Sequence, residues 1–171
     1  NIDKESQKSF DFFIKTFSKN IEVFDTPSYF DDIPKYHKII HETDMANNFQ
    51  GYYKKSKKFL SKEMVSAIER GLKYSAKEYA EAIDFMKRSY ESYKEVFEDF
   101  HGVLTPSSSG VAPKGLKSTG SPEFSTIWTY MGLPSISLPL LIGANNLPLG
   151  IQLVGDKLDD LRFLGVANWL E

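Results

Sequence analysis

The chain has 171 residues and a formal net charge of −2, from 21 Lys and Arg against 23 Asp and Glu. This balance predicts no electrostatic attraction of the whole chain to nucleic acid or to an anionic membrane. The absence of cysteine excludes a disulfide scaffold, a thiol nucleophile and a Cys-ligated metal, and it fits a cytoplasmic protein. No apolar run reaches the ~18 residues that a transmembrane helix needs, and no basic and apolar leader opens the chain. Because the first residue is Asn1 rather than Met, we expect a piece of a longer protein.

Composition changes near residue 101. The first 101 residues hold 35 of the 44 charged side chains, whereas 9 of the 11 glycines and 6 of the 8 prolines come later. A charged segment that is poor in Gly and Pro is typical of helices with one wet face, and the later composition favours buried strands and tight loops. The sequence therefore predicts a mainly helical part at residues 1–101, strands and loops at 102–171, and an α/β layer architecture.

Apolar spacing predicts the first elements. Phe10, Phe13, Ile14 and Phe17 lie at i, i+3, i+4 and i+7, as on one stripe of a helix. Residues 21–24 alternate and are interpreted as a short strand, and residues 33–49 are predicted as a second helix.

A capping box marks the start of a long helix. Ser75 and Glu78 can satisfy each other's backbone amides at a helix start. After it, apolar residues spaced by 4 and 3 continue to Phe100, and Gly102 is a suitable stop. A shorter helix with Val65 and Ile68 on one face precedes this box; Leu72 is predicted to share that face. The long helix is interpreted as a core helix, with an inter-chain helix contact as the alternative.

Period 2 replaces the helical spacing in the second half. Strands are predicted at residues 103–105, 135–140 and 149–154, separated by a Ser, Gly and Pro-rich loop at 107–124 and a helical turn at 127–131. Gly150 lies inside the last strand, which indicates close backbone approach. A closing helix is predicted at residues 159–170, and its expected inward side chains are Leu161, Leu164, Ala167 and Leu170.

Two further motifs favour structural interpretations over metal or nucleotide binding. His37 and His41 are spaced by four residues with Asp44 beyond, which can hold a metal but more often forms a solvated helix face. Residues 110–118 are similar to a phosphate loop, yet Pro113 removes a backbone donor and no helix start follows. We expect no metal and no cofactor.

The segment Ser107, Ser108, Ser109 and Gly110 follows a predicted strand end. A serine needs a positioned base to attack at neutral pH, and no Gly-x-Ser-x-Gly or Ser-x-x-Lys pattern supplies one here. These hydroxyls are therefore interpreted as a pocket wall or loop structure, with a nucleophile as the alternative.

The last part of the chain resembles the amidase signature family. The resemblance is carried by Val103-Leu-Thr-Pro106, Phe124-Ser-Thr-Ile-Trp128, Gly132-Leu-Pro134 and Leu147-Pro-Leu-Gly-Ile-Gln-Leu-Val-Gly155, which occur in the family's order and spacing. The helical part resembles the family more loosely. The resemblance implies a mixed sheet flanked by helices and amide hydrolysis by a Ser–cis-Ser–Lys triad. No segment here matches the family's Gly/Ser-rich nucleophile run or its lysine, and His101 stands where relatives carry Asp.

The resemblance thus implies that residues 1–171 are the C-terminal portion of an amidase, without its catalytic residues and inactive alone. By position, Ser107, Ser108, Ser109, Gly110 and Trp128 would border the substrate pocket. The expected partners are a small amide substrate and the missing N-terminal half of the same protein, with self-association as a further possibility and no nucleic acid or membrane contacted. The alternatives are a glutamine-hydrolysing subunit of a tRNA-dependent amidotransferase and a non-enzymatic interaction domain.

Overall fold

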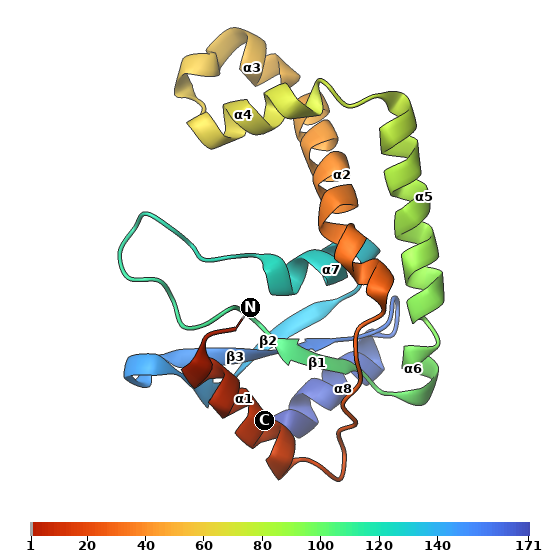
Figure 1. The fold of residues 1–171 in the computed structure, drawn as a ribbon, viewed down its shortest axis with the longest axis vertical. Helices are drawn as coiled ribbons and strands as arrows, with labels where there is room; N and C mark the ends of the chain where they lie inside the picture. The colour runs from red at the N-terminus through yellow and green to blue at the C-terminus, as the bar shows by residue number, and fades with distance from the viewer. Residues whose placement is uncertain (1) are drawn as a thin grey trace. The chain divides into compact units, whose positions relative to one another are not determined.

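The computed structural model describes residues 2–171, which divide into two compact units. Unit 1 contains residues 2–27 and 93–171, and unit 2 contains residues 28–92. Figure 1 shows the ribbon. Among the described residues, all strands lie in unit 1, and unit 2 is built from helices.

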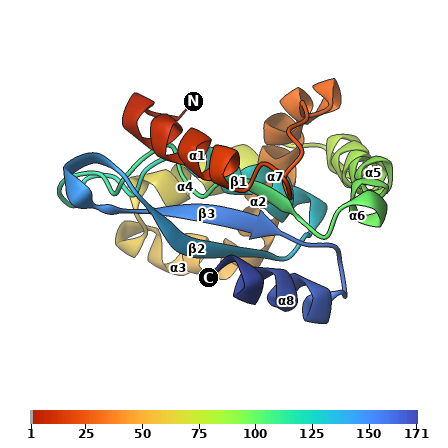
Figure 2. The same ribbon diagram turned by 90° about the horizontal axis from the view of Figure 1, so that it is seen from below.

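The sheet of unit 1 has three antiparallel strands in the order β1, β3, β2, with β3 in the middle (Figure 2). The strands are β1 (Val103–Pro106), β2 (Ser135–Ile142) and β3 (Pro148–Val154). The remaining elements of unit 1 are α1 (Lys4–Thr16), α6 (Val96–Asp99), α7 (Glu123–Met131), η3 (Ala144–Asn146) and α8 (Asp160–Leu170). The predicted combination of a sheet with flanking helices is confirmed.

All three strands predicted in the second half are confirmed, and β2 extends to Ile142 rather than Leu140. The strand predicted at residues 21–24 is wrong, because this segment pairs with no strand among the described residues. Val23 and Phe24 are exposed there. Alternation alone does not make a strand, since the backbone groups also need a hydrogen-bonded neighbour.

One face of the sheet is apolar and is covered by α1 and α8 (Figure 1). Leu138, Ile151 and Leu153 share this face by strand alternation. They pack in one core cluster with Phe13 of α1 and Phe163 of α8. Burying each such side chain contributes about 1.5–3 kcal/mol. A shift by one residue would turn this set outward, so the apolar face fixes the register and leaves the opposite face for polar side chains.

Two helices of unit 1 differ from the sequence prediction. The predicted helical turn at 127–131 is a longer helix, α7, which ends at Gly132 in the left-handed conformation with φ of 69°. In α8 the expected inward side chains Leu161 and Leu164 are exposed. Phe163 is buried instead, because its ring packs on the bare backbone of Gly155 at the end of β3.

Unit 2 contains η1 (Ser28–Asp32), α2 (Ile33–Asn48), α3 (Gln50–Ser56), η2 (Lys57–Phe59), α4 (Lys62–Gly71) and most of α5 (Ala76–Tyr93). The helices predicted around residues 33–49 and 65–72 are confirmed as α2 and α4, although Leu72 itself is exposed at the end of α4. The capping box is confirmed: Ser75 N–H donates to Glu78 Oε2 at 2.8 Å, and Glu78 N–H donates to Ser75 Oγ at 3.2 Å.

The long helix ends earlier than predicted. It stops at Tyr93, and a separate short helix, α6, follows from Val96. The Phe97 amide donates to Lys94 O at 2.9 Å, three residues back, so the chain tightens here. The apolar spacing of 4 and 3 continues across this break because Phe97 is still buried, next to the ring of Tyr93.

Candidate substrate-binding surface

The face of the sheet opposite the apolar core carries a polar row. Thr105 of β1 and Ser137 of β2 each lie directly opposite Gln152 of the central strand. The Thr105 hydroxyl donates to Gln152 Oε1 at 3.4 Å, and the Gln152 side chain is buried. A buried amide needs partners, so this row is a fixed polar surface rather than a random exposed patch.

Two serine hydroxyls meet above Gly150, at the end of this row. Ser107 Oγ and Ser137 Oγ lie 2.7 Å apart and form a hydrogen bond. A Cβ on Gly150 would lie 2.3 Å from Ser137 Oγ and 2.6 Å from Ser107 Oγ. The Ser107 amide also donates to Gly150 O at 3.1 Å, which holds this serine beside β3. Gly150 is therefore a position of close approach, as predicted, but the groups that crowd it are two side-chain hydroxyls rather than another backbone.

The other residues of the predicted serine segment are tied to the start of α1. The Asp3 amide donates to Ser109 O at 2.7 Å, and the Ser108 hydroxyl donates to Gly110 O at 2.6 Å. Gly110 lies against the Asp3 carboxylate, and a Cβ added to Gly110 would overlap a carboxylate oxygen. These contacts make Ser108 to Gly110 a folded turn, and they leave Ser107 as the member that faces the polar row.

The Asp3 carboxylate beside this turn is committed to helix capping. It accepts from the amides of Glu5 and Ser6, each at 3.0 Å, and from the Ser6 hydroxyl at 2.7 Å. The amide and hydroxyl of Ser6 hold the pKa of Asp3 below its usual value, with a smaller contribution from the Glu5 amide. A carboxylate that is ionised and already hydrogen-bonded in this way is a poor general base.

Trp128 lies in α7 and is buried, with its ring 5.7 Å from that of Tyr93. It lines a cavity of about 360 Å³ that Thr105 also lines. None of residues 107–110 lines this cavity. The structure therefore separates the five predicted pocket residues into two groups: residues 107–110 and Trp128. Thr105 connects them, because it lines the Trp128 cavity and lies on β1, the strand that leads to Ser107.

The hydroxyl pair above Gly150 suits ligand binding better than attack. When one serine hydroxyl donates to the other, the accepting serine still has its own O–H to donate to a substrate carbonyl. Both oxygens also keep lone pairs that can accept from a substrate N–H. Among residues 2–171, no Lys, His, Asp or Glu side chain is hydrogen-bonded to Ser107 or Ser137. Activation of a serine requires such a base.

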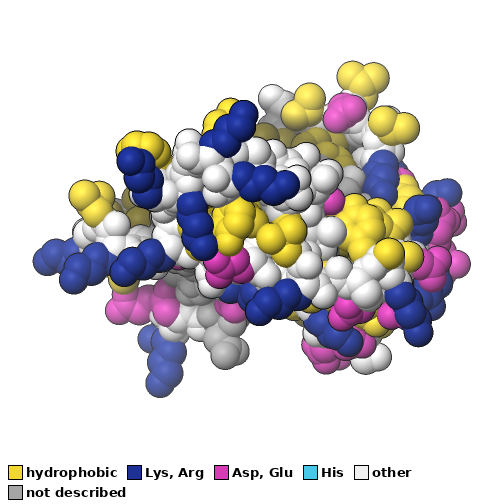
Figure 3. Space-filling view, turned by 90° about the horizontal axis from the view of Figure 1, so that it is seen from above, with side chains coloured by type: hydrophobic (Ala, Val, Ile, Leu, Met, Phe, Trp, Pro, Cys, Tyr) yellow, Lys and Arg dark blue, Asp and Glu magenta, His cyan; other side chains and the backbone are white. Residues whose placement is uncertain are grey.

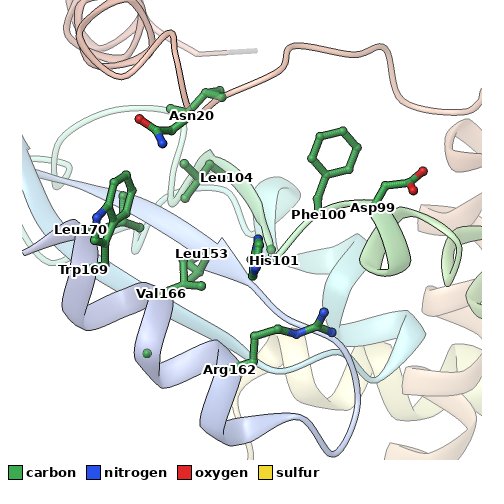
Figure 4. A pocket seen from close by; sticks show the side chains of 13 residues that line it. Asn20, Asp99, Phe100, His101, Leu104, Leu153, Arg162, Val166, Trp169 and Leu170 are labelled. Carbon is green, nitrogen blue, oxygen red and sulfur yellow. The ribbon is translucent and has the colours of Figure 1, made fainter.

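A larger cavity of unit 1, of about 650 Å³, lies between α8 and the chain around β1, and it shares Phe100 and Leu104 with the Trp128 cavity. Figure 4 shows Val166, Trp169 and Leu170 projecting from α8, with Leu104 and Leu153 nearby. Arg162 lines it too, but its guanidinium is bound to Asp159 at 2.5 Å and to Phe97 O at 3.1 Å. This cavity is lined mainly by apolar side chains, and none of the predicted pocket residues lines it. His101, where the family's Asp is expected, is among its lining residues.

His37 and His41 stack with ring centroids 5.7 Å apart on α2. Partial burial lowers the pKa of His37, and the nearby charge of His41 lowers it by a smaller amount. Within residues 2–171, no three His, Asp or Glu side chains gather closely enough to hold a metal ion.

Sequence reasoning missed Ser137, Thr105 and Gln152 as parts of the polar surface. The signal was present, because Ser135 and Ser137 alternate with apolar residues and Gln152 stands between Ile151 and Leu153. What the sequence does not contain is the register that brings Ser107 and Ser137, 30 residues apart, to one glycine.

Comparison with known proteins identifies the family. The Amidase family model matches residues 2–164, so the chain belongs to the amidase family. This confirms the resemblance to the amidase signature enzymes.

Similar proteins include both amidases and amidotransferase subunits. A glutamyl-tRNA(Gln) amidotransferase subunit of Alkaliphilus metalliredigens is 33% identical over 100 residues, which are 54% of this chain and 20% of the relative. Human fatty-acid amide hydrolase 2 is 32% identical over 114 residues, covering 63% of this chain and 21% of the relative. The crystal structure of an amidase superposes with a TM-score of 0.87 at 18% identity, covering 99% of this chain and 42% of that one. The chain thus spans about a fifth of the length of these two curated relatives.

Proposed function

We propose that this chain provides one wall of the substrate site of an amidase whose reacting serine and lysine lie outside residues 1–171. The observation that carries the proposal is the Ser107–Ser137 hydroxyl pair held 2.7 Å apart above Gly150. It lies on the polar face of the sheet, within the residues that match the family. In this proposal the pair orients the amide group of the substrate, and Trp128 and Thr105 border the neighbouring cavity.

The chemistry of the whole enzyme follows from the family's triad. A serine that gives its proton to the triad attacks the amide carbon, and backbone amides stabilise the oxyanion. The C–N bond then breaks, and the amine leaves with a proton returned by the triad. Water finally cleaves the acyl-serine ester and releases the carboxylic acid. The groups described here take no part in proton transfer. Their role is to hold the amide in place, which lowers KM more than it raises kcat.

The inactivity of the isolated chain is the first test. A chromogenic amide is incubated with the purified 171-residue chain, and with a variant carrying Ser108→Ala and Ser109→Ala. We expect no turnover from either. Serine-dependent turnover that the double substitution abolishes would overturn the proposal.

The wall itself is tested in the whole protein with Ser137→Ala. Loss of one hydrogen bond to the substrate should raise KM roughly tenfold with kcat little changed. Ser135→Ala is the matched control, because Ser135 is an exposed serine on the same strand and face but lies opposite Val154 rather than near Gly150. Equal kinetic effects of the two substitutions would contradict a specific role for the hydroxyl pair.

A second candidate function is the glutamine-hydrolysing subunit of a tRNA-dependent amidotransferase. The observation that favours it is the 33% identity to the Alkaliphilus metalliredigens amidotransferase subunit. Such a protein would act on free glutamine and would need partner chains. Glutamine hydrolysis by the whole protein, together with co-purification of a tRNA-binding partner, would support this candidate; hydrolysis of apolar acyl amides without partners would favour a free-standing amidase.

We also infer that the rest of the amidase covers apolar surface left open on unit 1. Leu161 is 91% exposed and Trp169 is 56% exposed on α8, beside the 650 Å³ cavity, and Phe12 of α1 is exposed as well. Surfaces of this kind associate in water. The isolated chain should therefore self-associate or bind its N-terminal half. Light scattering that shows a monodisperse monomer, together with a sharp thermal transition, would contradict this inference.

A further inference from the structure

A cluster of lysines lies at one corner of unit 2, where α3, η2 and the start of α4 meet. Its five lysines are Lys54, Lys55, Lys57, Lys58 and Lys62. Residues 45–62 contain no Asp or Glu, and residues 45–69 contain two, Glu63 and Glu69, which gives a net charge of 5 − 2 = +3 for that stretch. The net charge of −2 for the whole chain conceals this concentration.

Only one lysine of this corner is neutralised by a neighbour. Lys57 Nζ pairs with Glu69 Oε1 at 2.7 Å, and Tyr53 hydrogen-bonds to both. Within the part of the chain that the structure describes, Lys55, Lys58 and Lys62 form no ion pair, and Lys54 donates only to the neutral Gln50 side chain at 3.1 Å. Four cationic groups are therefore available to an external anion.

Three of these lysines surround a shallow hollow. Lys57, Lys58 and Lys62 line a depression of about 400 Å³ together with Leu60, Val65, Ser66 and Glu69. Glu69 is already paired with Lys57, so Lys58 and Lys62 are the lining cations that remain for an external phosphate group. The apolar side chains of Leu60 and Val65 suit the carbon atoms next to such a group.

Aromatic side chains stand out from the same corner. Phe59 is 79% exposed and Tyr52 is 64% exposed. The Lys58 ammonium lies 5.0 Å from the centre of the Phe59 ring. The space-filling view shows Lys and Arg side chains next to hydrophobic ones on the face seen from above (Figure 3). Lysines flanking exposed aromatic rings are typical of segments that lie in the headgroup region of a membrane.

We propose that this corner docks on an anionic phospholipid surface, with lysines on the phosphate groups and Phe59 inserted among the headgroups. The cationic side chains of the corner are all lysines, which act as point charges, whereas nucleic-acid recognition favours the planar fork of arginine. The proposed contact is one of surface association, because it uses exposed lysines and an exposed ring. It departs from the expectation that the chain contacts no membrane, which rests on the net charge of the whole chain. Every helix within residues 2–171 is too short or too polar to span a bilayer.

Co-sedimentation with vesicles tests the proposal on the full 171-residue chain. The vesicles contain either phosphatidylcholine alone or phosphatidylcholine with about a third phosphatidylglycerol, and a sample without lipid corrects for self-association. We expect binding to the anionic vesicles at low salt and its loss at high salt. The variant with Lys54, Lys55, Lys58 and Lys62 changed to Gln should bind more than about tenfold more weakly. Phe59→Ala should weaken binding while its salt dependence remains.

The matched control changes four lysines outside the corner to Gln, at Lys8, Lys15, Lys87 and Lys94, and should bind almost as the parent does. Circular dichroism checks that both variants keep their helices. Equal loss in the two variants would show a general charge effect and overturn the proposal. Equal binding to neutral vesicles would also overturn it, as would tighter binding to a single-stranded RNA or to free inorganic phosphate with no lipid association.

Discussion

Unit 2 buries a charged carboxylate whose two oxygens both accept hydrogen bonds, whereas unit 1 keeps two neutral hydroxyls nearer the surface that bond to each other. Glu42 of α2 is 3% exposed and accepts from Arg70 Nη2 at 2.6 Å and Nε at 2.8 Å, and from the Tyr74 hydroxyl at 3.2 Å. Within residues 2–171, Ser107 and Ser137 have only each other as side-chain partners. The hydrogen bonds of Glu42 join α2 to α4 and to the residues after it. The serine pair keeps a donor and acceptors that a ligand can use. This contrast separates polar groups that stabilise the fold from groups suited to function.

The contact of Gly71 with the backbone of α2 predicts the largest effect. A Cβ on Gly71 of α4 would lie 1.9 Å from Glu42 O and 2.5 Å from Glu42 C, both backbone atoms of α2. Gly71→Ala should therefore force the helices apart, at a cost of about 3 kcal/mol or more. Amide hydrogen exchange should report the loss as faster exchange in α2 and α4. Gly51→Ala is the matched control, since nothing lies within 4 Å of its Cβ position, and it should stabilise α3 by up to about 1 kcal/mol.

Removal of the buried charge comes next. Glu42→Gln should destabilise the protein by about 2 kcal/mol, because the Arg70 guanidinium loses its charged partner but stays partly hydrated. Glu69→Gln is the matched control, since Glu69 also pairs with a cation and a tyrosine but is much more exposed. Its effect should stay under about 1 kcal/mol. Urea unfolding of the whole protein measures both, and equal effects would remove the contrast between buried and exposed pairs.

Crowding the hydroxyl pair should have a smaller effect on stability. Gly150→Ala would place a Cβ 2.3 Å from Ser137 Oγ and 2.6 Å from Ser107 Oγ, so at least one hydroxyl must rotate away. We expect a cost of about 1–2 kcal/mol and a higher KM in the whole protein. The double variant with Ser137→Ala should recover part of the stability but not the KM. Recovery of both would mean that the pair is structural only.

The smallest expected effect is the contribution of Glu42 to the pH dependence of the unfolding free energy. Burial raises the pKa of this carboxyl, but the hydrogen bonds from Arg70 and Tyr74 outweigh it and hold the pKa below its ordinary value of 4.5. The unfolded chain then binds the proton more readily than the folded one, so this stabilisation is present above pH 4.5 and is lost as pH falls through the lower folded pKa. The unfolding free energy of Glu42→Gln should fall less steeply with acid than that of the parent. Parallel curves would contradict the assignment.

The sequence predicts most elements but few of their contacts. Apolar spacing locates α1, α2, α4 and the three strands, because periodicity reports which face is buried. It does not report the break after Tyr93, since Phe97 keeps the spacing while the chain tightens. For α8 it places Ala167 and Leu170 correctly in the core, but Leu161 and Leu164 are exposed and Phe163 is buried, because the ring of Phe163 packs on the open backbone at Gly155.

The candidate site likewise contains residues that the sequence predicts and residues that it does not. Ser107 is predictable from its place after a strand, and Gly150 from its place inside one. Ser137 is not, because its position beside Ser107 depends on the pairing of β2 and β3. The basic corner of unit 2 is visible in the sequence as a run of lysines, but only the exposure of Phe59 and the hollow lined by Lys58 give it a docking geometry.

Covalent labelling of the whole protein tests most directly whether this chain forms the wall and not the reacting group. A fluorophosphonate that modifies activated serines is added, and the adduct is located by mass spectrometry after proteolysis. The account predicts a single labelled serine outside residues 1–171, with Ser107 and Ser137 unmodified. An adduct on Ser107, Ser108 or Ser109 would contradict it, because a serine in this chain would then be the nucleophile.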